Sequence, residues 1–207
     1  FGASHVAADS AGSTVAILDT TSFWRMHHEL AAPVLALDGG LQAVDLRWNH
    51  GNRVLNTFRW ASSETLPAQD GWTAEAFDDT GWLRGPARMV CLSPLVARLS
   101  MRGRFEVADP AKVRGLRLNL GYRGGVIVYV NGKEVARKDI AGKDADGRPL
   151  ARGYPAEAFT PAGGWNGQWP RGGATESDQE VALRRRSASI EIPARFLRKG
   201  VNVLALE

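Results

Sequence analysis

Two tryptophans in a glycine-rich segment have the residue types and spacing that best suit ligand binding. Trp165 and Trp169 stand in the run GGWNGQWPRGG, where no neighbour is apolar enough to bury both rings. An indole ring offers a flat apolar surface to the C–H face of a sugar, while amide and guanidinium groups bind hydroxyls. The segment therefore predicts a surface platform for a sugar, with these polar partners: Asn166, Gln168 and Arg171.

Tyr154, which precedes this run, is a further candidate for the platform. Two alternatives stay open for Trp165 and Trp169: they anchor the segment on the domain as a plug, or the segment is disordered. The other tryptophans stand in apolar or turn contexts and are expected in the core or as anchors. They are Trp24, Trp48, Trp60, Trp72 and Trp82.

Neighbouring carboxylates occur twice, but neither pair predicts catalysis. Hydrolysis of a glycoside needs two carboxyl groups on opposite sides of the bond, a separation that sequence neighbours do not guarantee. Asp78 and Asp79 are expected to accept backbone N–H bonds in a turn. Asp144, Asp146 and Gly147 resemble part of a calcium loop, but the rest of an EF-hand ligand series is missing, so a solvated loop is favoured. No catalytic residue is predicted.

The histidines and the single cysteine predict neither a metal site nor a nucleophile. His27 and His28 are adjacent in an expected strand, so their rings point to opposite faces. A meeting of His28 with His50 across a sheet is the remaining, weak alternative for zinc. Cys91 lies in an apolar run and has no disulfide partner, which favours a buried apolar role. We therefore expect no metal and no cofactor.

The composition is that of a globular domain and argues against several partners. Hydrophobic residues make up 44% of the 207 residues and charged residues 23%. The formal net charge is +4, and the densest basic run, 184–186, would alternate between the faces of a strand, so no nucleic-acid partner is expected. No apolar stretch approaches the length of a membrane span. The chain starts at Phe1 and ends within an apparent strand, so we expect it to be a piece of a larger polypeptide.

Strands must position these residues, because alternating and β-branched runs are common and helical periodicity is scarce. Asn131 and Gly132 tolerate positive φ, which a two-residue type I′ hairpin needs at both central positions. A short helical turn ending in Gly200 and a long irregular insert over 141–180 are also expected. The expected strands outside the hairpin are 15–18, 23–30, 44–48, 53–60, 98–107, 113–122, 181–192 and 201–207.

Four local patterns follow one another in a characteristic order. They are AFDDTGW from residue 76, RGRFEV from residue 102, VIVYVNGKEVAR from residue 126 and IEIPARFLRKGVNVLALE from residue 190. Together they resemble the galactose-binding-like jelly roll found in sugar-binding and ancillary domains of glycoside hydrolases. In that family an F-D-D-S-x-W turn precedes an R-x-x-F strand, a V-N-G hairpin and a final strand with G-x-N. The resemblance covers roughly residues 70–207.

The resemblance implies an all-β antiparallel sandwich with long loops and one or two short helical turns. We expect a single domain over 1–207, with N-terminal strands in 1–65 and a galactose-binding-like core over 66–207 that contains the insert. Such domains also bind ligands on a concave sheet face, where the hairpin would offer Arg123, Lys133 and Arg137, although ordinary surface charge is the favoured interpretation of these three. A structural calcium ion is common in them, but the sequence offers no convincing ligand set.

The implied function is that of a non-catalytic carbohydrate-binding module of a larger secreted or cell-envelope protein. Its partners would be a polysaccharide or glycan and the neighbouring domains of the parent chain. The alternatives are a β-sandwich that serves structure or protein interaction without a sugar ligand, and a non-catalytic fragment of a glycoside hydrolase. An exposed pair of rings at Trp165 and Trp169 would favour sugar binding.

Overall fold

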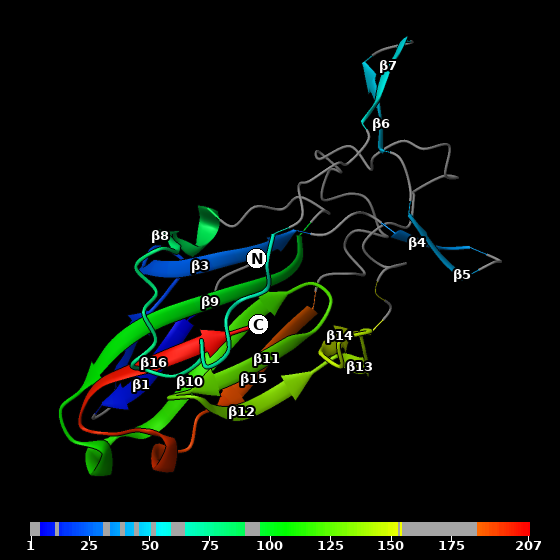
Figure 1. Cartoon of the computed structure of the whole chain (residues 1–207). Coiled ribbons are helices and arrows are strands. Elements are labelled where there is room, and N and C mark those ends of the chain that lie inside the picture. The colour runs from blue at the N-terminus through cyan, green and yellow to red at the C-terminus, as the bar shows by residue number, and fades with distance from the viewer. Residues whose placement is uncertain are drawn as a thin grey trace.

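The fold is an antiparallel β-sandwich of two sheets that share one hydrophobic core (Figure 1). This confirms the all-β architecture expected from the sequence. The computed structural model describes residues 5–10, 13–30, 34–37, 40–43, 46–50, 53–58, 65–89, 96–152, 154 and 186–207. Over these ranges, no helix has the length and apolar character needed to cross a membrane.

Six strands form the larger sheet, in the order β12-β11-β16-β9-β3-β8. Their bounds are Phe23–Leu30 for β3, Leu83–Pro86 for β8, Val96–Val107 for β9, Val126–Val130 for β11, Lys133–Lys138 for β12 and Gly200–Leu206 for β16. The last of these strands in sequence, β16, pairs with β11 on one side and with β9 on the other. The two halves of the sheet are therefore joined through β16.

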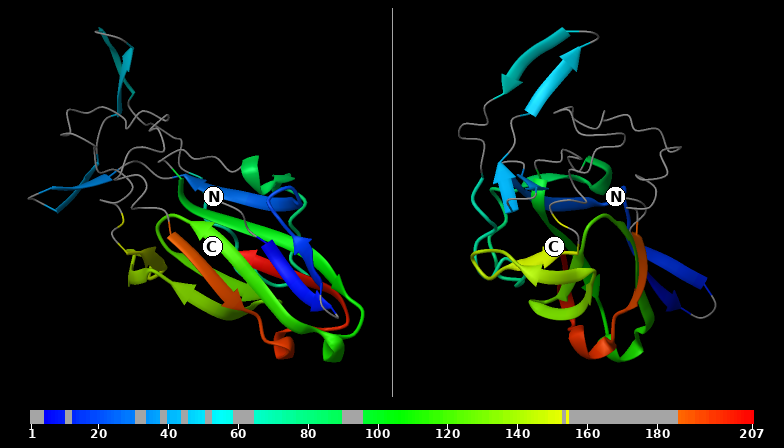
Figure 2. Two further views of the ribbon diagram at one scale, coloured as in Figure 1. Left: turned by 180° about the vertical axis from the view of Figure 1, so that it is seen from behind. Right: turned by 90° about the vertical axis from the view of Figure 1, so that its right-hand side faces the viewer.

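Four strands form the smaller sheet, in the order β15-β10-β1-β2, which faces the viewer in the left panel of Figure 2. Their bounds are His5–Ser10 for β1, Ser13–Leu18 for β2, Arg114–Tyr122 for β10 and Arg186–Glu191 for β15. In β10, Leu116, Leu118 and Leu120 are buried and the residues between them are exposed. This is the alternation that the sequence predicts for a strand with one face on the core.

Trp24 and Gly103 show how tightly the two sheets pack. Trp24 is fully buried and its Nε1–H donates to the backbone oxygen of Asp19 at 3.0 Å. A Cβ at Gly103 would lie 2.8 Å from side-chain atoms of both Leu18 and Trp24. Strand β9 therefore needs glycine at this position, because any side chain would displace the indole ring.

The turn between β11 and β12 has the predicted type I′ geometry, with φ of 51° at Asn131 and 81° at Gly132. Its asparagine also fastens the hairpin to β16. The Asn131 side chain donates to Asn202 Oδ1 at 2.8 Å and to the Phe196 carbonyl at 2.9 Å, and its Oδ1 accepts from the Val203 N–H at 2.9 Å. The turn motif thus has a structural role: it connects the hairpin to β16 through side-chain hydrogen bonds.

Three two-stranded sheets complete the described strands. They pair β4 (Val34–Leu37) with β5 (Gly40–Ala43), β6 (Leu46–His50) with β7 (Arg53–Phe58), and β13 (Ile140–Lys143) with β14 (Pro149–Ala151). The β13–β14 hairpin corrects the expectation of an irregular insert from residue 141, because Gly147, at φ 79°, allows a turn inside it. Three short 3₁₀ turns occur where one or two were expected: Ala87–Met89, Pro110–Lys112 and Ala194–Phe196.

Candidate ligand-binding face

The outer face of the six-stranded sheet, away from the core, carries an unusual set of ionisable side chains. In β3, Trp24 and Met26 enter the core, so Arg25, His27 and Glu29 lie on the opposite face. The register sets these three against Arg102, Ser100 and Arg98 of β9, respectively. A crossing segment, residues 65–82, runs over this face between β3 and β8 (Figure 1).

Arg102 holds the crossing segment on the sheet, and we call this contact the Arg102 latch. The side chain is fully buried; Nε donates to Asp79 Oδ2 at 2.7 Å, and Nη1 donates to the Ala74 carbonyl at 2.8 Å and to the Trp72 carbonyl. Arg104 donates to both oxygens of Asp79 at 3.1 Å. Asp79 is itself buried, so the predicted turn aspartate is an anchor inside the fold.

The neighbouring carboxylate, Asp78, behaves as the sequence predicts. It is exposed, and Oδ1 accepts from the N–H and the hydroxyl of Thr80 at 3.0 and 2.7 Å. These hydrogen bonds lower the pKa of Asp78, with the Thr80 hydroxyl as the largest cause. Both carboxylates of this pair therefore have structural partners.

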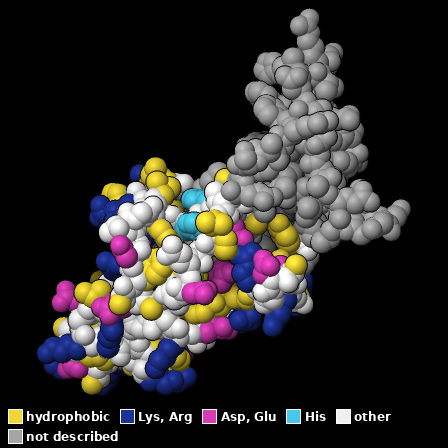
Figure 3. Space-filling model, in the orientation of Figure 1, with side chains coloured by type: hydrophobic (Ala, Val, Ile, Leu, Met, Phe, Trp, Pro, Cys, Tyr) yellow, Lys and Arg dark blue, Asp and Glu magenta, His cyan; other side chains and the backbone are white. Residues whose placement is uncertain are grey.

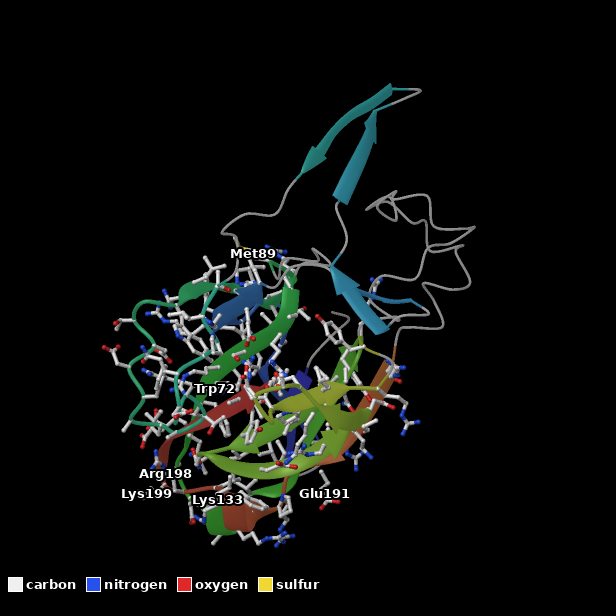
Figure 4. The ribbon with its side chains drawn as sticks, turned by 45° about the vertical axis from the view of Figure 1, so that its right-hand side comes forward. Trp72, Met89, Lys133, Glu191, Arg198 and Lys199 are labelled. Atoms are coloured by element: carbon white, nitrogen blue, oxygen red, sulfur yellow. The ribbon has the colours of Figure 1, made fainter. Side chains whose placement is uncertain are left out.

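An aromatic row, formed by His27, Trp82, Trp72 and Tyr129, crosses the middle of the face. The ring centroids are 5.2 Å apart for His27 and Trp82, 5.9 Å for Trp82 and Trp72, and 6.0 Å for Trp72 and Tyr129. All four side chains are partly exposed. Figure 4 shows Trp72 over the sheet. Trp72 and Trp82 thus anchor the crossing segment, as expected, and both residues stay partly exposed.

Beside the aromatic row lies the Arg98 cluster, centred on one arginine of β9. The Arg98 guanidinium donates to Asp144 Oδ2 at 2.8 Å and to the Pro149 carbonyl at 2.7 Å. It also lies 3.4 Å from Glu29 Oε1 and 3.5 Å from Glu207 Oε1. Arg98 thereby joins β3, the β13–β14 hairpin and the end of β16.

Arg148, in the β13–β14 hairpin, is the second cation of the Arg98 cluster. It lies 2.9 Å from Glu29 Oε2, 3.2 Å from Asp144 Oδ2 and 3.6 Å from Asp146 Oδ2. Side chains of both signs gather near this hairpin in Figure 3. Asp144 Oδ1 accepts the backbone N–H groups of Asp146 and Arg148 at 3.0 and 2.8 Å. Asp144 therefore shapes the turn of the β13–β14 hairpin.

Partial burial perturbs the titration of several groups in the cluster. Burial raises the pKa of the Glu207 carboxyl, which Arg98 counteracts. Burial, with the charges of Glu207 and Glu134, raises the pKa of Tyr129 to about 12. For Asp144, burial acts upward, but hydrogen bonds from the Arg148 backbone and from Arg98 outweigh it and lower the pKa. The pKa is thus raised for Glu207 and lowered for Asp144, although both carboxylates belong to the Arg98 cluster.

Tyr154 is the only residue of the predicted sugar platform within the described chain. It is partly buried, its N–H donates to the Ala151 carbonyl at 3.2 Å, and burial raises the pKa of its hydroxyl, with opposing effects from Arg98 and Glu29. Tyr154 therefore belongs beside the Arg98 cluster. The remaining members of the platform lie outside the described residues: Trp165, Asn166, Gln168, Trp169 and Arg171.

Other residues considered from the sequence have ordinary surroundings. Arg137 and Glu134 form an exposed ion pair at 2.9 Å, and Lys133 is exposed, as expected for surface charge. Burial lowers the pKa of His28. Across the part of the chain that the structure describes, no three His, Cys, Asp or Glu side chains are grouped to hold a metal ion. His50 and Cys91 fall outside the side chains described.

The main residues of this face were not singled out from the sequence. Glu29, Arg98, Tyr129 and Glu207 come from four separate strands or strand ends, so no single local motif contains all four. The available signal was alternation: charged or polar residues at 98, 100, 102 and 104 share one face of β9 while its apolar residues face the core. This alternation places the charged row on the face of β9 away from the core, but it does not show which other strands bring side chains to that face.

Comparisons with known proteins include a distant structural similarity. The chain is similar to a glycosyl hydrolase family 2 member from Bacteroides cellulosilyticus, at 11% sequence identity and a TM-score of 0.37. The similarity covers 90% of this chain and 16% of that chain. No protein-family model and no curated protein matches the sequence. So distant a similarity defines neither a family nor an activity for this chain.

Proposed function

We propose that this chain is a non-catalytic carbohydrate-binding module of the galactose-binding-like jelly-roll type, part of a larger secreted or cell-envelope protein. The observation that supports it is the proximity of the partly exposed aromatic row to the hydrogen-bonding groups of the Arg98 cluster, on one face of one sheet. The proposed ligand is a polysaccharide or glycan.

The chemistry of the face suits a sugar. The exposed part of the Trp72 ring would lie against the C–H face of a pyranose, where burial of apolar surface contributes about 25 cal/mol per Å². Tyr129 links this ring to the cluster, since its hydroxyl lies 3.4 Å from Glu207 Oε2. The carboxylates and guanidinium groups would then exchange hydrogen bonds with sugar hydroxyls, which fixes orientation.

The test is binding of the chain to a glycan array, with Trp72→Ala as the diagnostic variant. The substitution keeps the Trp72 carbonyl that Arg102 uses, so the latch is preserved. Loss of a central aromatic contact should weaken binding at least tenfold, about 1.4 kcal/mol or more. The matched control is Phe23→Ala, because Phe23 is an exposed ring outside the row.

Absence of binding of the wild-type chain to any glycan would refute the proposal, and so would a Trp72→Ala variant that binds as tightly as wild type. Trp165→Ala/Trp169→Ala, measured in the same assay, tests the platform predicted from the sequence. Hydrolysis of any bound glycan by the chain would refute the non-catalytic assignment.

A packing module that binds no sugar is the second candidate, favoured by a different feature. Phe23, Leu83 and Met89 are 50–60% exposed and lie on or beside the edge strand β8. An apolar, open strand edge of this kind suits contact with a neighbouring domain of the parent protein. Two results together would support this candidate. The wild-type chain would bind no glycan on the array, and the triple variant Phe23→Ser/Leu83→Ser/Met89→Ser would lose binding to that neighbouring domain.

A further inference from the structure

Among the residues that the structure describes, the charges in the Arg98 cluster do not balance. Two cations, Arg98 and Arg148, form ion pairs with four carboxylates, an excess of two negative charges when all are ionised. The carboxylates are Glu29, Asp144, Asp146 and Glu207. The next cation along this face, Arg137, is already matched by Glu134 at 2.9 Å, so it does not offset the excess. A ligand at this cluster therefore meets a negative local potential.

Glu207 has spare acceptor capacity for a ligand. Within the described part of the chain, its two oxygens make only long contacts, 3.5 Å to Arg98 Nε and 3.4 Å to the Tyr129 hydroxyl, whereas an ionised carboxylate can accept about four hydrogen bonds. Asp144, by contrast, accepts from Arg98 at 2.8 Å and from two backbone N–H groups. The Glu207 side chain is 19% exposed, so a small donor group can approach it.

Glu207 is also the carboxylate next to the aromatic row. The Tyr129 hydroxyl lies against it, and the Tyr129 ring centroid is 6.0 Å from that of Trp72. A sugar ring resting on Trp72 would direct a ring substituent towards Glu207. Glu207 is largely buried, has unused acceptor capacity and lies in a cluster with excess negative charge. The substituent that fits it best is therefore a positively charged hydrogen-bond donor.

We infer that this face selects sugars that carry a protonated amine, such as hexosamines without an N-acetyl group, over uronic or sulfated sugars. The inference rests on the proposed function and names its ligand class. An ammonium group brings three donors and one positive charge, and its hydrogen bonds to a carboxylate are about twice as strong as neutral ones. An acidic sugar would place like charges together in the same site.

The Arg102 latch has the opposite balance, since Arg25, Arg102 and Arg104 all surround Asp79. It lies apart from the excess at Glu207, since residues 98 and 102 are separated by four strand positions, about 13 Å. The two ends of the face therefore differ in sign.

The experiment is a glycan array of matched oligosaccharides that differ in one substituent: amine, N-acetyl, hydroxyl or carboxylate, in gluco and galacto series. It is read at about pH 6, where carboxylates are ionised and a sugar amine is protonated. The wild-type chain should bind the amine member at least tenfold more tightly than the matched N-acetyl member. Glu207→Gln keeps the shape and removes the charge, and should reduce this ratio to threefold or less.

The control is Glu191→Gln, which removes a carboxylate exposed on β15 of the other sheet and should leave the ratio unchanged. Equal binding of all members, tighter binding of the carboxylate member, or an unchanged ratio in Glu207→Gln would each overturn the inference while the proposed function stands. A blank array for wild type would instead overturn the proposed function, and the inference with it.

Discussion

Arg98 and Arg102 stand four residues apart on the same face of β9, yet they do different things. Arg102 is fully buried, and its described partners all come from the crossing segment: Asp79 and two backbone carbonyls. Arg98 keeps 12% of its side chain exposed and meets carboxylates from β3, the β13–β14 hairpin and the end of β16. The two residues are of the same type and lie on the same face of the same strand, so their different roles come from their surroundings.

The comparison teaches how to separate a structural arginine from one available to a ligand. In the Arg102 latch, two backbone carbonyls and one carboxylate of the crossing segment take three of the five guanidinium N–H donors, and the side chain has no exposed surface. In the Arg98 cluster, carboxylate side chains with spare acceptors stand at the solvent boundary. Burying the whole guanidinium fixes the backbone, whereas an exposed network can exchange partners at low cost.

The sharpest way to break the comparison is Asp79→Ala. This change leaves the buried Arg102 charge without its carboxylate, and loss of one partner of a buried pair costs about 3–5 kcal/mol. We expect that loss in the free energy of unfolding, measured with urea. The control is Lys112→Ala, which removes an 84% exposed ion-pair partner and should stay within about 0.5 kcal/mol of wild type. A loss below 1 kcal/mol would show that the latch is not structural.

A smaller effect is expected from Arg98→Met. Three carboxylates lose their central cation. Asp144 and Glu207 are partly solvated, and the buried Glu29 keeps its ion pair with Arg148, so the cost should be about 1–2 kcal/mol at low salt. Because repulsion among the remaining carboxylates is screened by ions, the cost should shrink in about 1 M salt. Unfolding experiments at the two ionic strengths measure this. A salt-independent cost as large as that of Asp79→Ala would make Arg98 a second latch.

The smallest effect concerns the tyrosines, and it sharpens the view of the Arg98 cluster as an electrostatic unit. Burial raises the pKa of Tyr129 and of Tyr122 from 10.0 to about 12. Each tyrosine therefore contributes stability that is fully present below pH 10 and is lost as the pH rises through about 12. Glu207→Gln should lower the pKa of Tyr129, since the Glu207 charge helps to raise it, and leave that of Tyr122 unchanged.

Ultraviolet absorbance of the phenolate, followed against pH in wild type, Glu207→Gln and Tyr122→Phe, measures this shift and assigns it. Tyr122 serves as the internal control, because its hydroxyl donates to Asp139 at 2.7 Å, outside the cluster. Tyr154 is the third tyrosine of the chain, so a phenolate step near pH 10 that persists in folded Tyr154→Phe would contradict the expectation for Tyr122 or Tyr129.

The sequence predicts the fold better than the site. Asn131 and Gly132 give the hairpin turn directly, and the leucines of β10 give its core face, because both depend on local geometry. The sequence predicts only part of the role of Asp79. Its place in a turn could be predicted, but its burial against Arg102 depends on how the crossing segment lies on the sheet.

The candidate site escapes sequence reasoning because its parts meet only through the strand order. Glu29 and Arg98 become neighbours through the β3–β9 register, and Glu207 joins them because β16 lies beside β9. A hairpin inside the expected irregular insert then supplies Arg148. Of the predicted platform, Tyr154 comes close to this cluster, while the tryptophan pair stays a prediction.

The central place of β16 has a consequence for how the protein is made. A ribosome delivers this strand after all the others described, so until then β12–β11 and β9–β3–β8 remain separate, each with an unpaired edge. The pairing spans long sequence separations, which slows folding. Its arrival closes the sheet, engages Asn202 with Asn131 and brings Glu207 to Arg98. Nascent chains therefore lack the proposed ligand-binding face until β16 has joined the sheet.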